Sequence, residues 1–275
     1  MKRTAMNRLL FSLTCAAGFA SGARAAEGPP AVSNDRLSLT ANGETLTNTN
    51  GGGGAAVSWL HNFNANTIVG IGGEYQSIST ANWKFATVNF AFGRGLAESR
   101  SNFYVDLHEG NGKDLGRSYD YSMETVGVYQ NVTRQLVLQL EDKQIDIDAT
   151  HGNLPKFGVQ YLWSPRVQTG VSFAKSLNGN LGTRLYAARI DYFGKNANVL
   201  AGGAWGQASA RVVNYVPGGL NIPGQTLHEG YVGVAKTFSN VDVTAVGDYQ
   251  KLSFSERVTL TVSATVHLRS QGSNR

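Results

Sequence analysis

The chain is poor in cysteine, proline and long hydrophobic runs. Its single cysteine, Cys15, lies near the start of the 275 residues, so no second thiol is present to form a disulfide. There are only six prolines. After residue 25 no apolar run approaches the roughly 18–20 residues of a membrane-spanning helix. These absences exclude a disulfide scaffold and a bundle of membrane helices.

The first 25 residues have the features of a secretory signal peptide. Lys2, Arg3 and Arg8 precede a mostly apolar, uncharged core over residues 9–20, and small residues at 23–25 form a cleavage site. We therefore predict that the chain is exported and that residues 1–25 are removed.

Removing the signal peptide almost abolishes the net charge. The whole chain has 24 basic and 19 acidic side chains, and four of the basic ones (Lys2, Arg3, Arg8 and Arg24) lie in the signal, which leaves 20 against 19. The apparent basicity is therefore a targeting charge. It does not indicate a nucleic-acid partner.

What the chain does have is strict alternation. In residues 257–269 the odd set, Thr259 to Arg269, is polar and the even set, Val258 to Leu268, is apolar. Successive side chains of a strand point to opposite faces, and a tilted strand of roughly 9–11 residues crosses a bilayer. Similar segments recur at about 36–46, 55–62, 67–78, 83–94, 102–109, 118–130, 135–146, 156–164, 166–176, 182–193, 197–210, 226–238, 241–250 and 257–269.

The connections differ between the two ends of these segments. Short turns follow most even-numbered segments, whereas longer polar or glycine-rich stretches, at 47–54, 109–117, 146–155 and 211–225, follow several odd-numbered ones. This difference is typical of outer-membrane barrels. A soluble sandwich or lipocalin-like barrel is the competing fold, but here the apolar face contains many small residues and the polar face is crowded with Thr, Gln, Asp and Arg.

We predict an all-β fold, a single antiparallel up-and-down transmembrane β-barrel of about 14 strands, with 12 as the alternative. The barrel occupies residues 36–269, between a disordered lead-in at 26–35 and a polar tail at 270–275. Residues 257–269 are expected to pair with 36–46, so that no strand edge stays exposed.

The alternating strands, export signal and loop asymmetry resemble those of bacterial outer-membrane β-barrel proteins. Asn153-Leu-Pro-Lys-Phe-Gly-Val-Gln-Tyr161, followed by Gln168-Thr-Gly-Val-Ser-Phe173, resembles the YaiO-type small barrels linked to exopolysaccharide export. The resemblance implies the outer membrane of a Gram-negative bacterium, with the lipid bilayer and the assembly machinery as partners. One departure is that the usual terminal aromatic residue is absent, because Leu268-Arg269 is followed by a polar tail.

Function then depends on the inward face. The predicted lumen-lining residues are Arg36, Asn89, Tyr104, Asp106, His108, Glu124, Glu141, Lys143, Arg189, Asp191, Glu229, Asp242, Asp248, His267 and Arg269. The apolar members of the longest loop predict a gate folded into the mouth, with Tyr215, Pro217, Leu220 and Ile222 as candidates. These features predict a pore or export conduit for small polar solutes or a polar polymer such as a polysaccharide. A non-conducting structural or surface-interaction barrel is the alternative.

No pattern indicates catalysis, a metal or a cofactor. The five histidines lack metal-ligand spacing, and residues 51–54 are glycine-rich but are not followed by a phosphate-binding Lys-Ser/Thr pair. An outer-membrane lipid-modifying enzyme is a distant third hypothesis, because no Ser, His and acid set is marked. We predict no enzymatic activity.

Overall fold

A computed structural model describes residues 35–47, 51–63, 67–78, 81–96, 99–114, 117–208, 224–253 and 255–268. Within these ranges the chain forms fourteen strands. They are β1 (Asp35–Leu46), β2 (Gly52–Asn62), β3 (Thr67–Ile78), β4 (Ala81–Leu96), β5 (Ser99–Asp114), β6 (Arg117–Asn131), β7 (Leu136–Ile147), β8 (Thr150–Ser164), β9 (Val167–Lys175), β10 (Arg184–Phe193), β11 (Asn198–Ala208), β12 (Gln225–Phe238), β13 (Val241–Leu252) and β14 (Ser255–Leu268).

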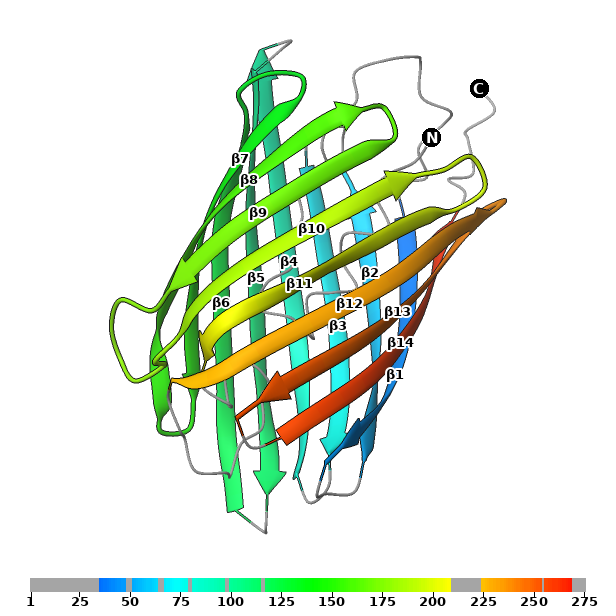
Figure 1. Cartoon of the computed structure of the whole chain (residues 1–275). Coiled ribbons are helices and arrows are strands. Elements are labelled where there is room, and N and C mark those ends of the chain that lie inside the picture. The colour runs from blue at the N-terminus through cyan, green and yellow to red at the C-terminus, as the bar shows by residue number, and fades with distance from the viewer. Residues whose placement is uncertain are drawn as a thin grey trace.

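The strands close into one antiparallel up-and-down barrel (Figure 1). Each strand pairs with its neighbours in the chain, and β1 pairs with β14 from Asp35↔Leu268 to Leu46↔Arg257. The predicted fold and the count of fourteen are confirmed, and the twelve-strand alternative is wrong. We call the end that carries Asp35 and Leu268 the terminal end, toward the top of Figure 1, and the opposite end the distal end.

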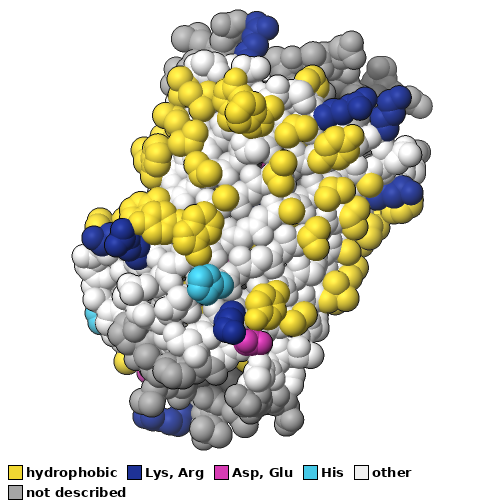
Figure 2. Space-filling model, viewed as in Figure 1, with side chains coloured by type: hydrophobic (Ala, Val, Ile, Leu, Met, Phe, Trp, Pro, Cys, Tyr) yellow, Lys and Arg dark blue, Asp and Glu magenta, His cyan; other side chains and the backbone are white. Residues whose placement is uncertain are grey.

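The alternation on β14 separates an outer from an inner face. Val262 is 45% exposed, whereas its neighbour Ser263 is 2% exposed. The same parity holds along the strand, with Val258 and Leu260 outside and Thr259 inside. Hydrophobic side chains cover the middle of the wall in Figure 2, and Lys and Arg side chains lie toward its two ends. The apolar face therefore points outward and the polar face inward.

Two predicted long loops are strands instead. β5 continues to Asp114 and β8 begins at Thr150, so the stretches 109–117 and 146–155 mostly extend the barrel wall. Polar side chains satisfy one another across these strands: Ser122 Oγ donates to Glu109 Oε1 over 2.7 Å, and Asn153 Nδ2 donates to Asp142 Oδ2 over 2.9 Å. The polar composition predicted loops because it lacks an apolar face, yet cross-strand polar pairs support a sheet in water as well.

Several predictions concern residues outside the described ranges. These include the signal peptide, the lead-in apart from Asp35, which begins β1, and the polar tail. Within the described part of the chain, no helix is long and apolar enough to cross a membrane.

Candidate functional site: the barrel interior

Most of the predicted lumen residues lie on the inward face of their strands. The inward set contains Arg36, Tyr104, Asp106, His108, Glu141, Lys143, Arg189, Asp191, Glu229, Asp242, Asp248 and His267. The side chain of Asn89 and the whole of Arg269 lie outside the description.

Glu124 is the exception, and its placement corrects the prediction. On β6 the odd-numbered side chains are buried inside, among them Tyr121, Met123 and Thr125, so Glu124 is exposed on the outer wall. Toward the distal end of β6 to β8 the usual polarity is reversed, with apolar side chains inside and polar ones outside. A rule that assigns every polar side chain to the interior therefore fails there.

A hydrogen-bonded network occupies the interior beside β5 to β8. Glu141 lies 3.1 Å from Lys156 Nζ at both carboxylate oxygens, and the Tyr104 hydroxyl donates to Glu141 Oε2. Gln139 Nε2 donates to Glu141 over 3.1 Å and to the Tyr129 hydroxyl over 3.0 Å. We call Tyr104, Tyr129, Gln139, Glu141 and Lys156 the paired network. Every member is buried, and Tyr104 and Glu141 are among the predicted lumen-lining residues.

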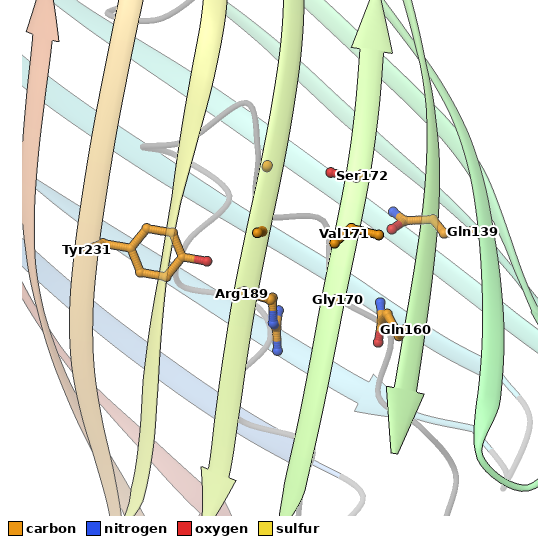
Figure 3. Close-up of a pocket in the computed structure, with 9 residues that line it drawn as sticks. Gln139, Gln160, Gly170, Val171, Ser172, Arg189 and Tyr231 are labelled. Atoms are coloured by element: carbon orange, nitrogen blue, oxygen red, sulfur yellow. The ribbon is translucent and has the colours of Figure 1, made fainter. Parts of the chain in front are cut away.

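A small cavity lies between this network and β12. Its volume is about 20 Å³, and Gln139, Gln160, Arg189 and Tyr231 line it. Figure 3 shows Tyr231 extending from β12 toward Arg189 on β10, with the two glutamines on the other side. Arg189 Nε donates to Asp191 Oδ2 over 2.8 Å. The space suffices for a water molecule, which needs roughly 10–15 Å³.

The inward residues of β1, β14, β13 and β12 form a different surface, which we call the polar ladder. From the terminal to the distal end its rungs are Arg36 with His267; Ser38 with Thr265 and Asp242; Thr40 with Ser263 and Thr244; Asn42 with Thr261 and Val246; Glu44 with Thr259 and Asp248; and Arg257 with Gln250 and Glu229. The strand register places these side chains across from one another. The ladder therefore runs along the whole wall.

Every rung of the polar ladder contains a buried polar atom without a hydrogen-bond partner in the protein. These atoms are Arg36 Nε, Asp242 Oδ1, Ser263 Oγ, Asn42 Oδ1, Asp248 Oδ1 and Oδ2, Thr259 Oγ1, Arg257 Nε and Nη2, Gln250 Oε1 and Glu229 Oε1. Leaving one such group unsatisfied costs about 1–3 kcal/mol, and buried polar groups are normally bonded to protein or to water. The ladder is therefore a surface that requires water or a polar solute beside it.

Apolar side chains pack together inside the distal end of the barrel. Tyr121, Ile145, Ile147 and Leu154 pack together inside β6, β7 and β8, and Leu46 of β1 packs against them. Since β1 stands across the barrel order from β7 and β8, this contact spans the lumen. A second cluster lies on the inner side of β10 to β13 and contains Leu185, Ala208, Leu227 and Leu252. We call the two clusters together the distal cap.

The connection between β9 and β10 contributes to the distal cap. Leu181 is completely buried within it. Asn180 holds the connection against the start of β8 and the turn before it. Its Oδ1 accepts from the His151 amide over 2.9 Å, and its Nδ2 donates to the Ala149 carbonyl over 2.6 Å. Sequence reasoning missed this segment; the signal available was a lone leucine among the turn residues Asn178, Gly179, Asn180 and Gly182. The predicted gate, with Tyr215, Pro217, Leu220 and Ile222, lies outside the described residues.

The described interior does not gather metal ligands. Within the described ranges no group of three or more His, Cys, Asp or Glu side chains is placed to hold a metal ion. Two of the histidines pair with aspartates: His267 Nε2 lies 2.6 Å from Asp242 Oδ2 inside the barrel, and His61 Nδ1 lies 2.9 Å from Asp35 Oδ1.

No protein-family model and no curated protein matches the chain. Among solved structures it is similar to the CymD monoaromatic hydrocarbon channel, with a TM-score of 0.62 and 10% identity over 87% of this chain and 90% of that one. The Pseudomonas putida toluene transporter TodX matches with a TM-score of 0.53, 9% identity, and coverage of 87% and 90%. The Acinetobacter baumannii outer membrane protein Omp33 matches with a TM-score of 0.52, 10% identity, and coverage of 86% and 100%.

These likenesses show the fold alone. The chain shares the barrel architecture of an outer-membrane protein, a channel and a transporter, at a sequence identity too low to carry over what those proteins bind. The similar structures do not support the resemblance to YaiO-type barrels, which stays a prediction.

Proposed function

We propose that the mature chain is an outer-membrane channel of a Gram-negative bacterium that passes small polar solutes along the polar ladder. The closed strand order, with β1 paired to β14, leaves no unpaired edge in lipid. The outward parity is apolar along the strands, as at Val258, Leu260 and Val262. The fold shared with known channels supports the same function.

The polar ladder is the observation that carries this proposal. A barrel that serves only as a scaffold should satisfy its own interior, because an incompletely satisfied polar network is less stable than an apolar core. The paired network meets that requirement, but the ladder does not at any rung. Water or solute that follows the ladder from end to end supplies the missing hydrogen bonds.

The distal cap supports a closed state of the proposed channel in this arrangement. The cavity beside Arg189 and Tyr231 has a volume of about 20 Å³, and Leu46 packs against the distal cap from across the interior. Hydrophobic constrictions gate channels by excluding water, and displacing the β9–β10 connection with Leu181 would break such a constriction. The fold shared with known channels does not support polysaccharide export specifically.

A non-conducting barrel is the second candidate, and the paired network favours it. Glu141 and Lys156 neutralise each other in a buried position, as expected of an interior that is only filled. The two candidates differ in one measurable property, which is ion conductance.

Planar-bilayer recording of the refolded mature chain tests the proposal. We expect stepwise conductance that falls in Thr261→Trp, which fills a rung of the ladder, and is unchanged in Val262→Trp, which points outward on the same strand. Leu181→Ser is expected to raise the open probability by loosening the distal cap. Absence of conductance in both the wild type and Leu181→Ser would establish the non-conducting barrel.

A further inference from the structure

The last rungs of the polar ladder bring acidic and basic groups together just inside the distal cap. Gln250 Nε2 donates to Glu229 Oε2 over 3.3 Å, and Gln250 is in direct register with Arg257. Asp248 precedes Gln250 by two residues on the same inward face and is in register with Thr259. We call Glu229, Asp248, Gln250, Arg257 and Thr259 the distal polar site.

Glu44 already neutralises the arginine of this site. Arg257 Nη1 lies 3.5 Å from Glu44 Oε2, and Gln76 Nε2 donates to Glu44 Oε1 over 2.8 Å. In the described part of the chain, no basic side chain lies within ion-pair distance of Asp248 or Glu229. Since Arg257 is paired with Glu44, the two remaining acidic groups, Asp248 and Glu229, have no ion-pair partner of their own among the described residues.

The unsatisfied atoms of the distal polar site define what would fit it. Asp248 is only 7% exposed, and neither of its carboxylate oxygens has a partner. Glu229 Oε1, Gln250 Oε1 and Thr259 Oγ1 are further oxygens without a partner. A cationic group with several N–H donors, such as an ammonium, can donate a hydrogen bond to more than one of these acceptors.

Arg257 differs from these oxygens because it has unsatisfied donors, which need an acceptor. Its Nε and Nη2 have no partner, whereas Nη1 is directed to Glu44. Nε–H and Nη2–H form one edge of the guanidinium plane, and this edge matches the two oxygens of a carboxylate. The site thus offers a carboxylate fork close to a pair of acceptors for an ammonium.

We propose that the distal polar site binds a small amino-acid-like solute with a net positive charge, such as a basic amino acid. Its ammonium groups donate to Asp248 and Glu229, and its carboxylate accepts from Arg257. A positively charged solute is attracted to the two acidic groups, which a neutral sugar is not. A bare divalent cation is a poorer occupant, because it requires six to eight oxygens and is repelled by the guanidinium. This inference rests on the proposed function, since it names the solute class that the channel selects.

The binding test uses the refolded mature chain in detergent, with L-lysine as the probe in isothermal titration calorimetry. Asp248→Asn and Glu229→Gln are each expected to weaken lysine binding roughly tenfold or more, because each removes a charge-assisted hydrogen bond. Glu124→Gln, on the outer wall, is the matched control and is expected to bind as the wild type does. Asn and Gln keep the side-chain shape, and heat-modifiable gel mobility verifies that each variant is folded.

Two further probes separate the parts of the site. Cadaverine, which lacks a carboxylate, is expected to bind more weakly than lysine but with the same dependence on Asp248. Hexanoate, which lacks an amine, is expected not to bind. Equal affinity for lysine and cadaverine would overturn the role of the Arg257 fork, and lysine binding that is unchanged in both Asp248→Asn and Glu229→Gln would overturn the site.

Bilayer recording distinguishes failure of the site from failure of the channel. A conducting wild type whose current lysine blocks, with the block lost in Asp248→Asn, supports both proposals. A conducting wild type with the same lysine block in Asp248→Asn refutes the distal polar site and leaves the channel standing. A silent wild type that still binds lysine through Asp248 refutes the channel and leaves a binding site.

Discussion

The ring of Tyr104 on β5 covers Gly127, its direct partner on β6. A Cβ atom at Gly127 would overlap that ring, so only glycine leaves the tyrosine room to lie along the inner wall. The same relationship recurs between Tyr231 and Gly202. In each case the glycine lets an inward tyrosine bring its hydroxyl close to other polar groups, as Tyr104 does when it donates to Glu141.

Gly127→Ala is therefore expected to destabilise the barrel by about 1–3 kcal/mol, because the added methyl displaces Tyr104 and disturbs its bond to Glu141. Denaturant unfolding in detergent, followed by tryptophan fluorescence, measures the change. Gly247→Ala is the control, since nothing lies within 4 Å of a Cβ placed there. Equal stability of the two variants would mean that the tyrosine adapts freely.

The ion pair of the paired network gives a second prediction. Lys156→Met leaves Glu141 buried without its cation and is expected to lower the free energy of unfolding by about 3–5 kcal/mol. Adding Glu141→Gln should recover much of that loss, because no charge then remains to be compensated. The double-mutant cycle in the same unfolding assay measures the coupling between the two side chains. Additive effects would show that the pair contributes nothing beyond its parts.

The two faces of β14 give a third prediction. Val262→Arg places a charge on the outer, lipid-facing wall and is expected to cost about 2–4 kcal/mol at the middle of the membrane, enough to impair assembly. Ser263→Arg directs the same charge onto the polar ladder and is expected to insert and to alter only conductance. Heat-modifiable mobility together with outer-membrane fractionation compares the two. Equal tolerance of both substitutions would refute the assignment of the faces.

The distal cap gives a fourth prediction. Leu181→Ala removes a fully buried side chain and is expected to cost about 2–5 kcal/mol locally, which releases the β9–β10 connection. Limited proteolysis should then cleave this connection faster than in the wild type. Leu177→Ala, in the same connection but 74% exposed, is expected to have little effect. Slow cleavage of Leu181→Ala would mean that Asn180 alone holds the connection in place.

The alternation of the sequence was a reliable guide where one face is apolar. It placed Val258 to Leu268 outside and Thr259 to His267 inside, and it predicted the pairing of the first and last strands. It failed for Glu124, because that part of β6 carries polar side chains outside and apolar ones inside. It also failed for the stretches 109–117 and 146–155, where polar residues form strands. The polarity of a side chain therefore predicts whether it faces inward or outward only where it is known which face of that strand segment is polar.

The sequence by itself predicted the closure of the barrel and the facing of the apolar segments, because side-chain direction along a strand is a local property with a period of two. It left the strand number at about 14 with 12 as the alternative, and the structure decided for fourteen in the described residues. Only the tertiary structure decided which polar side chains meet. Glu141 pairs with Lys156, whereas Arg257, which lies near Asp248 and Glu229, pairs with Glu44, and Leu46 packs against the distal cap from across the barrel. Those contacts depend on the register between strands and on residues far apart in the chain, which no local pattern contains.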